Sequence, residues 1–251
     1  MQQQKLSQFF KKNSRIAVAY SGGVDSSYLL HAAKAAGCDV RAYYIKSQFQ
    51  PKIELDSAIG FAARLGVALT VDALNALEDP IVANNSVGRC YQCKAHVLNR
   101  LWALAEADGF EVLCDGTNAD DNEADRPGMK ALGELGVLSP LRNCGLSKAD
   151  VRRLSKEAGL STHDKQSYPC LATRVPQGTQ LTVGLLEKIE WAEKTLLNMG
   201  FSNLRVRFDP PSGAKIQLPS SQIDAAMTKR AEIISAFSPM FKTITLDLIG
   251  R

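Results

Sequence analysis

The first 160 residues alternate between short apolar runs and longer amphipathic segments. Each apolar run has the length and composition of a buried parallel strand. These runs are residues 15–20, 40–45, 67–71 and 112–114. The segments with helical periodicity are residues 26–36, 51–64, 91–107 and 147–158. Strands that alternate with helices predict an α/β fold, in which a doubly wound parallel sheet is covered by helices on both faces.

The pattern changes after residue 160. Residues 161–180 contain prolines and a glycine but show little periodicity, which is typical of a loop that joins two domains. Beyond this loop we expect a helix that ends at Gly200, strands over 204–208 and 214–218, a helix over 222–236 and a strand over 243–248. The expected organisation is a large domain over 1–160, a joining loop over 161–180 and a small α+β domain over 181–251.

Composition excludes several classes of protein. The chain has 251 residues, with 30 Lys and Arg against 26 Asp and Glu, so its net charge of +4 permits anionic small molecules and does not require nucleic acid. Its apolar runs are shorter than the roughly 20 residues of a membrane-spanning helix, so we expect no membrane association. The start MQQQKLSQFFKKN lacks the apolar core of a secretory signal. We therefore expect a cytoplasmic protein whose six cysteines remain reduced.

A glycine-rich loop stands between the first predicted strand and the first predicted helix. Residues 21–27 read SGGVDSS, and Gly22 and Gly23 let the backbone turn tightly against an anion. The helix that follows would present unpaired N–H groups to that anion. Serine hydroxyls add donors, from Ser21, Ser26 and Ser27. Asp25 has the wrong charge to bind phosphate by itself, and we expect it to hold Mg²⁺. The loop lacks the lysine of a Walker loop, so it predicts a phosphate site of another type.

Three cysteines stand in settings that favour chemistry over packing. Cys90 and Cys93 form a CxxC motif at the start of a predicted helix, and Cys170 lies in the joining loop, four residues before Arg174. Three interpretations stay open from the residues alone: structural zinc, an iron–sulfur cluster with one open iron, and a nucleophilic Cys170 beside an unrelated CxxC pair. The other cysteines lie in or beside apolar stretches and are expected in the core: Cys38, Cys114 and Cys144.

The glycine-rich loop resembles that of the ATP pyrophosphatase (PP-loop) superfamily, and further motifs are more specific. They are RCYQCK at 89–94, DGTNADD at 115–121, RPG at 126–128, SPL at 139–141, CLATRVPQGT at 170–179 and LRVRF at 204–208. Together they resemble the ATP-dependent sulfur transferases of nickel-pincer nucleotide synthesis, the LarE-type family. The chain ends at LDLIGR, where that family usually continues with a short tail, so contacts made by such a tail are unassigned here.

The resemblance implies a substrate and a reaction. ATP with Mg²⁺ would adenylate a carboxylate of pyridinium-3,5-biscarboxylate mononucleotide, and sulfur would displace AMP to leave a thiocarboxylate, for the maturation of lactate racemase. The resemblance also implies that Gly116 and Asn118 bind ATP together with the glycine-rich loop, and that the chain forms a homo-oligomer. The substrate-binding residues that we expect are Arg174, Arg205, Arg207 and Glu193.

The resemblance leaves two sources for the sulfur. In family members with a single key cysteine, that residue gives up its own sulfur and becomes dehydroalanine, and it matches Cys170. The presence of Cys90 and Cys93 fits the subgroup with three cysteines, in which a [4Fe-4S] cluster passes on sulfide. We favour the cluster, which would permit many turnovers, and we expect Cys170 to be the reactive residue in both schemes.

The residues themselves support an anionic nucleotide as substrate. Arg205 and Arg207 are two positions apart on a predicted strand, so both point to one face, where paired guanidinium groups suit phosphate or carboxylate. A solvated strand face is the alternative. Glu193 would hold a metal or a ribose hydroxyl, or belong to a solvated helix face. The acidic loop 115–125 would face the nucleotide or Mg²⁺, or be a plain turn, and the role of Arg126 stays undecided.

Three other functions compete with sulfur transfer to a small molecule. A tRNA thiolation enzyme would use the same loop and a three-cysteine cluster, but it predicts an RNA-binding module or a strong basic stripe, and the near-balanced charge argues against both. An ammonia-using synthetase would need no reactive cysteine. A regulatory nucleotide-binding module would bind ATP and release no pyrophosphate.

Overall fold

The structure of the chain, a computed structural model, describes residues 1–122 and 128–251. Arg126 lies outside the described residues. The chain divides into two compact units. The first unit is Met1–Ala76 with Gly88–Ser167, and the second unit is Leu77–Val87 with Tyr168–Arg251. The segment 77–87 thus belongs with the C-terminal part of the chain, although its sequence pattern did not separate it from the first domain.

A four-stranded parallel sheet forms the centre of the first unit, with the strand order β3-β2-β1-β4. The strands are β1 (Arg15–Ala19), β2 (Asp39–Lys46), β3 (Ala68–Ala73) and β4 (Leu113–Asp115). Strand β1 pairs with β2 in a register that places Ile16 beside Val40, and with β4 in a register that places Ala17 beside Leu113. Because β1 has a neighbour on each side and helices over both faces, Ile16, Ala17 and Val18 are fully buried.

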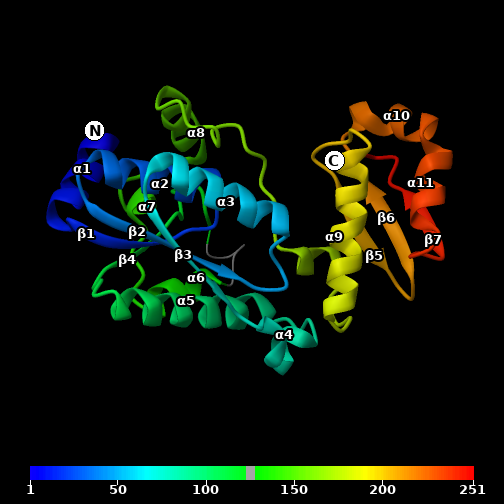
Figure 1. Cartoon of the computed structure of the whole chain (residues 1–251), viewed down its shortest axis with the longest axis horizontal. Helices are drawn as coiled ribbons and strands as arrows, with labels where there is room; N and C mark the ends of the chain where they lie inside the picture. Colours follow the sequence, from blue (N-terminus) through cyan, green and yellow to red (C-terminus); the bar gives the residue numbers. More distant parts are fainter. Residues whose placement is uncertain (123–127) are drawn as a thin grey trace. The chain divides into compact units, whose positions relative to one another are not determined.

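Helices cover both faces of this sheet (Figure 1). The core on one face contains Ile16 and Val18 with residues of α1, α2, α3 and α8, and the core on the other face contains Ala17 with residues of α5 and α6. Alternate residues of β1 therefore supply opposite cores. The helices of this unit are α1 (Gln2–Lys12), α2 (Val24–Ala35), α3 (Lys52–Leu65), α5 (Arg89–Ala107), α6 (Met129–Glu134), α7 (Pro140–Asn143) and α8 (Lys148–Glu157). This arrangement confirms the predicted doubly wound α/β fold.

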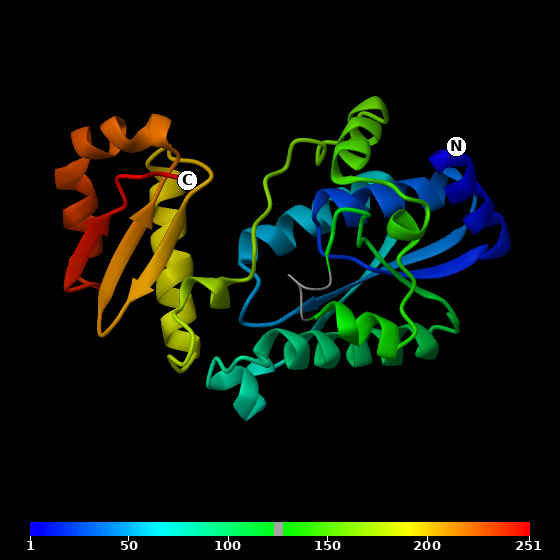
Figure 2. The same cartoon turned by 180° about the vertical axis from the view of Figure 1, so that it is seen from behind.

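The second unit contains a small mixed sheet and its helices (Figure 2). Strand β6 (Gly213–Gln217) lies between β5 (Arg205–Asp209), which is antiparallel to it, and β7 (Thr243–Leu246), which is parallel. The unit's helices are α4 (Pro80–Ala83), α9 (Val183–Asn198), α10 (Ile223–Thr228) and α11 (Arg230–Phe237), with short 3-10 turns at Leu171–Arg174 and Ser220–Gln222. Residues of α9, β5, β6, α10 and α11 form one hydrophobic core, as expected for a small α+β domain.

Several helical segments differ from the sequence-based expectation, since the short helices α4, α6 and α7 lie outside the predicted ones. Helix α1 was not expected, because its buried residues are only Leu6 and Phe10 and, apart from the partly buried Phe9, the rest of its sequence is polar. The helix predicted over 222–236 is interrupted at Lys229, whose backbone angles of −88° and 15° leave the α-helical region. The Nζ of Lys229 donates a hydrogen bond to the carbonyl of Met199, 2.7 Å away, which fixes the interruption against the end of α9.

The segment 77–87 joins the second unit through backbone contacts that no local pattern indicates. The N–H of Leu181 donates to the carbonyl of Ala83 at 2.7 Å, and the N–H of Gly178 donates to the carbonyl of Asn85 at 3.1 Å. The buried side chain of Asn85 donates to the carbonyl of Pro176 at 2.8 Å. These bonds tie α4 to the loop that follows Cys170.

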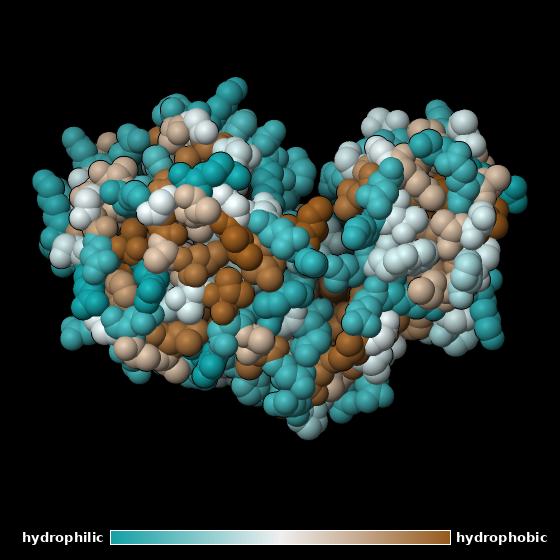
Figure 3. All heavy atoms as spheres, in the orientation of Figure 1, coloured by the Kyte–Doolittle hydropathy of each residue, from teal (hydrophilic) through white to brown (hydrophobic). Residues whose placement is uncertain are grey.

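The surface of the first unit combines polar helix faces with hydrophobic side chains near its edge strand (Figure 3). Ile59 of α3 is 44% exposed and Val71 of β3 is 41% exposed. This exposure accompanies the open edge of β3, whose partner among the described strands is β2. In the part of the chain that the structure describes, each helix is too short or too polar to cross a lipid bilayer.

The N-terminus of α8 offers a test of the fold, because α8 packs against α2. The Oγ of Ser147 accepts a hydrogen bond from the N–H of Asp150, and the Asp150 carboxylate accepts one from the N–H of Ser147, both at 3.1 Å. Ser147→Ala removes the first bond, and we expect it to lower the free energy of unfolding by about 1 kcal/mol in urea denaturation. Ser14→Ala, at an exposed serine before β1, is the control, and an equal effect of both changes would contradict the role of this cap.

Candidate functional site

The chain turns sharply between β1 and α2. Gly22 has a φ of +74°, which a residue with a side chain adopts only at a cost, and a Cβ at this position would lie 3.1 Å from the Cβ of Ala58 in α3. The N–H of Ser21 donates to the Oγ of Ser26 at 3.3 Å, and the Oγ of Ser26 donates to the carbonyl of Gly23 at 3.3 Å. The loop is therefore closed onto the first turn of α2.

The N-terminus of α2 has the properties of an anion site. Gly23 is its N-cap residue, and no described side chain caps the first N–H groups of the helix. Such groups, together with the helix dipole, attract phosphate. Ser27, in the first turn of this helix, is fully buried, and its Oγ lies 3.3 Å from the hydroxyl of Tyr20. This contact holds the first turn of α2 in place.

The residues that follow β4 lie beside this loop. Strand β1 has β2 on one side and β4 on the other, so the order of the sheet reverses between β1 and β4, where open α/β sheets bind their ligands. A Cβ on Gly116 would lie 2.7 Å from the backbone nitrogen of Ser26. The amide of Asn118 donates to the carboxylate of Asp25 at 3.4 Å. Gly116 and Asn118 are thus brought to the glycine-rich loop.

Asp25 is paired with a lysine from a distant part of the chain. The Nζ of Lys148, at the start of α8, forms an ion pair with one carboxylate oxygen of Asp25, and Asn118 donates to the other. A single carboxylate together with substrate phosphates is an environment that Mg²⁺ accepts. Asp25 therefore fits the expected role of magnesium ligand when the cation takes the place of Lys148.

The other described acidic residues of this loop bind nearby groups of the protein. Asp115 is buried and accepts hydrogen bonds from the hydroxyls of Thr117 and Ser139, at 2.6 and 2.7 Å. Asp120 accepts from the backbone N–H of Lys148 at 2.8 Å, and Asp121 accepts from that of Asn118 at 3.0 Å. These contacts favour the plain-turn interpretation of the described acidic residues, which shape the loop that presents Asn118.

The cysteines fall into the expected groups. Cys90 is exposed and Cys93 is half-buried, both in the first turn of α5, whereas Cys170 belongs to the second unit. Cysteine thiolates are the usual ligands of iron–sulfur clusters. Among the described residues, however, no three His, Cys, Asp or Glu side chains are grouped so as to hold a metal ion. Cys114 and Cys144 lie in the core, as predicted, whereas Cys38 is half-buried and packs against that core; burial raises the pKa of all three thiols.

Cys170 stands at the start of the 3-10 turn Leu171–Arg174 and is half-buried. The N–H and hydroxyl of Thr173 both donate to the carbonyl of Cys170, at 3.0 and 2.8 Å. Leu171 and Ala172 are fully buried and anchor the turn. The backbone of the cysteine is consequently held in place.

A buried ion pair between Arg174 and Glu193 holds this turn in place. Arg174 and Glu193 are 2% and 1% exposed, and the Nε of Arg174 lies 2.9 Å from Glu193 Oε1. The same guanidinium donates to the carbonyls of Pro169 and Cys170, at 2.9 and 3.4 Å. The contact with the cysteine is thus made at its carbonyl, and in this conformation Arg174 holds the turn in place.

Both carboxylate oxygens of Glu193 accept hydrogen bonds from other groups of the protein. Besides Arg174, its carboxylate accepts hydrogen bonds from the N–H of Val206, at 2.9 Å, and from the hydroxyl of Tyr168. Burial and the charge of Glu193 raise the pKa of Tyr168, so its hydroxyl stays protonated and donates. Glu193 is therefore neither a solvated helix residue nor, in this conformation, directed at a ligand.

Arg207 of β5 reaches the turn Leu171–Arg174 that follows Cys170 (the cysteine turn), and Arg205 reaches Tyr168, two residues before Cys170. The guanidinium of Arg205 lies 5.1 Å from the ring centre of Tyr168, and that of Arg207 donates to the carbonyl of Thr173 at 2.8 Å. Burial, with the charges of Arg174 and Arg251, lowers the pKa of Arg205 to about 10. Positive charge gathered in this way would be relieved by a bound anion such as phosphate or carboxylate.

No protein-family model matches the chain. A pyridinium-3,5-bisthiocarboxylic acid mononucleotide synthase of Lactiplantibacillus plantarum is 33% identical to it over 243 residues, which cover 96% of this chain and 88% of that protein. The chain belongs to this LarE-type family. Uncharacterized proteins of Synechocystis sp. and Methanocaldococcus jannaschii are 36% identical over 251 residues and 31% identical over 238 residues. These two alignments cover 98% and 94% of this chain, and 93% and 90% of the respective relative.

Three residues of this LarE-type chain carry site contacts that sequence reasoning missed. Lys148 reaches Asp25 from 123 positions away, and Lys165 reaches the carbonyl of Gly22 from 143 positions away. Tyr168 lies between two arginines, with its ring centre 4.8 Å from the guanidinium of Arg174. No local motif marks either lysine, whereas the position of Tyr168 two residues before Cys170 offered a signal.

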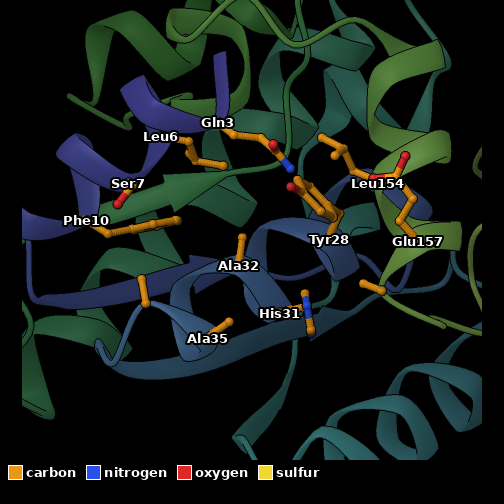
Figure 4. Close-up of a pocket in the computed structure, with 12 residues that line it drawn as sticks. Gln3, Leu6, Ser7, Phe10, Tyr28, His31, Ala32, Ala35, Leu154 and Glu157 are labelled. Carbon is orange, nitrogen blue, oxygen red and sulfur yellow. The ribbon is translucent and has the colours of Figure 1, made fainter. Parts of the chain in front are cut away.

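A pocket of about 350 Å³ on the first unit of this LarE-type chain is separate from these residues. It lies between α1, α2 and α8, where Figure 4 shows Leu6, Tyr28, His31 and Leu154 around it. None of the described residues that line it is among those predicted for the site. In each unit the candidate residues are therefore located by their contacts and not by the size of a cavity.

The buried pair Arg174–Glu193 yields a stability prediction for this LarE-type chain. Arg174→Met leaves the Glu193 carboxylate buried without its cation, and we expect a loss of about 3–5 kcal/mol in the free energy of unfolding. In the double variant Arg174→Met, Glu193→Met neither charge remains, so we expect it to be more stable than Arg174→Met. Urea denaturation followed by circular dichroism measures both, and a double variant less stable than the single one would contradict the pairing.

Proposed function

We propose that this chain is an ATP-dependent sulfur transferase that converts carboxylates of pyridinium-3,5-biscarboxylate mononucleotide to thiocarboxylates, in nickel-pincer nucleotide synthesis for lactate racemase. The observation that carries the ATP-dependent chemistry is the glycine-rich loop at the β1–β4 switch point, with the N-terminus of α2 uncapped by described side chains. The product class comes from the name of the Lactiplantibacillus plantarum relative.

The first step is activation of the carboxylate. The donors of the loop hold the β- and γ-phosphates of ATP, and Asp25 serves Mg²⁺ beside them. A carboxylate oxygen of the substrate attacks the α-phosphorus, the bond from phosphorus to the bridging oxygen breaks, and pyrophosphate leaves. The product is an acyl-adenylate, in which AMP is a good leaving group. Asn118 holds the Asp25 carboxylate in place for this step, in which the cation replaces Lys148 as its partner.

The second step transfers sulfur. When Cys170 supplies it, the thiolate attacks the acyl carbon, AMP leaves, and a thioester forms. Removal of the α-proton of Cys170 then breaks its Cβ–Sγ bond, which leaves dehydroalanine in the chain and a thiocarboxylate on the product. A [4Fe-4S] cluster held by Cys90, Cys93 and Cys170 would instead supply sulfide. We favour the cluster, because this chain carries all three thiols.

The substrate is anionic, and the arginines of β5 suit it. We propose that Arg205 and Arg207 bind its phosphate or carboxylate, since Arg207 contacts the cysteine turn and Arg205 contacts Tyr168 just before it. Arg174 and Glu193 serve the same site through the turn that they hold. The carbonyl contacts of Arg174 then keep Cys170 in a fixed relation to β5.

Cys170→Ala separates the two steps. We expect this variant to release pyrophosphate from ATP in the presence of the biscarboxylate and to form no thiocarboxylate, because activation does not need the thiol. Pyrophosphate release and mass spectrometry of the product measure the two steps, with Cys38→Ala as the control. Thiocarboxylate formed at the normal rate by Cys170→Ala would contradict its role. Loss of pyrophosphate release by a folded Cys170→Ala would place the thiol in the first step.

The iron content of the protein distinguishes a cluster from Cys170 as the source of sulfur. We expect protein purified without oxygen to be brown, to contain iron and sulfide, and to lose both when Cys90→Ser and Cys93→Ser are combined. Cys144→Ser, at a buried thiol, is the control for cysteine replacement. Colourless wild-type protein whose intact mass falls by the elements of H₂S after one turnover would contradict the cluster and assign the sulfur to Cys170 itself.

A further inference from the structure

A lysine from the segment that leads to Cys170 lies against the glycine-rich loop. The Nζ of Lys165 donates a hydrogen bond to the carbonyl of Gly22 at 3.0 Å and to the Oγ of Ser57 at 3.4 Å. It also forms an ion pair with Glu54 of α3 at 2.9 Å, and both side chains are 19% exposed. The cation is thus largely enclosed between the loop and the first turns of α3.

The backbone around Lys165 is fixed as well. Arg152 of α8 donates one hydrogen bond to the carbonyl of Lys165 at 2.9 Å and another to the carbonyl of His163 at 2.8 Å. The N–H of Lys165 donates to the carbonyl of Thr162 at 3.1 Å, and the Thr162 side chain is buried. The lysine is therefore presented to the loop by an ordered turn, which distinguishes it from a solvated lysine whose contact is incidental.

The contact determines how one peptide of the loop is oriented. In a trans peptide, the carbonyl of one residue and the N–H of the next point in opposite directions. Because Lys165 holds the carbonyl of Gly22, the N–H of Gly23 is directed away from Lys165 and Glu54. Gly22 is the residue with a φ of +74°, and glycine leaves this peptide free to rotate unless something holds it.

We infer that Lys165 is a positioning residue, which together with Glu54 holds the Gly22–Gly23 peptide in the orientation that binds phosphate. The inference rests on the proposed function, since it assigns the loop to the phosphates of ATP. Lys165 acts through the peptide and does not itself contact the phosphate.

Binding of pyrophosphate with Mg²⁺, measured by isothermal titration calorimetry on the full chain, tests this role. We expect Lys165→Met to weaken binding about tenfold, because a charged hydrogen bond that orders the loop is lost. Lys165→Arg keeps a cationic donor, and we expect it to retain most of the affinity. Lys34→Met is the matched control, since the Nζ of Lys34 donates to the carbonyl of Gly66, 2.6 Å away, at another glycine of the same unit. We expect it to bind as the wild type does.

Glu54→Gln distinguishes a positioning role from direct contact with the ligand. If Lys165 orients the peptide, loss of the carboxylate that holds it weakens pyrophosphate binding, as Lys165→Met does. If Lys165 bound phosphate directly, Glu54 would compete for it, and Glu54→Gln would tighten binding. Tighter binding therefore overturns the inference. Glu54→Gln and Lys165→Arg also provide the test should Lys165→Met fail to fold.

The inference and the proposed function fail in different ways. Wild-type protein that binds neither pyrophosphate nor ATP contradicts the proposed function, and the inference fails with it. Wild-type protein that binds pyrophosphate while Lys165→Met binds it equally well contradicts the inference alone. An equal loss of affinity in Lys165→Met and Lys34→Met also overturns it, because the effect would then come from lost charge and not from the loop contact.

Discussion

The sharp turn between β1 and α2 is the constraint on which the first unit depends. Gly22 holds a left-handed conformation, and its α-carbon faces Ala58 so closely that a side chain would stand 3.1 Å away. The turn follows the carboxyl end of β1, and β1 is the strand beside which the order of the sheet reverses. The glycine-rich loop, the N-terminus of α2 and the residues after β4 therefore lie together at the carboxyl ends of the parallel strands.

A buried ion pair has the corresponding part in the second unit. Taking the charges of Arg174 and Glu193 out of water is costly, and their attraction offsets that cost only when further hydrogen bonds satisfy both groups. Those further bonds end on the carbonyls of Pro169 and Cys170 and on the N–H of Val206. The pair thus links the cysteine turn, α9 and β5, and it anchors the backbone of Cys170 near the arginines of β5.

Much of the architecture could be predicted from patterns within a few residues. Alternating short apolar runs and amphipathic segments indicated the parallel sheet and its helices, because one strand or one helical face is determined by neighbours two to four positions apart. The same local logic located the glycine-rich loop, the Ser147 cap and the shared face of Arg205 and Arg207. Helix α1 could not be predicted in this way, since its buried face consists of two residues.

The sequence by itself thus determined the fold class, the loop and the chemistry-bearing residue types. Only the tertiary structure decided what those residues contact. It paired Asp25 with Lys148, brought Lys165 to Gly22, buried Glu193 against Arg174 and joined the segment 77–87 to the second unit. A local pattern cannot specify such pairings, because each one joins residues whose proximity exists only after helices and strands have packed, and whose separation along the chain leaves no periodic signal.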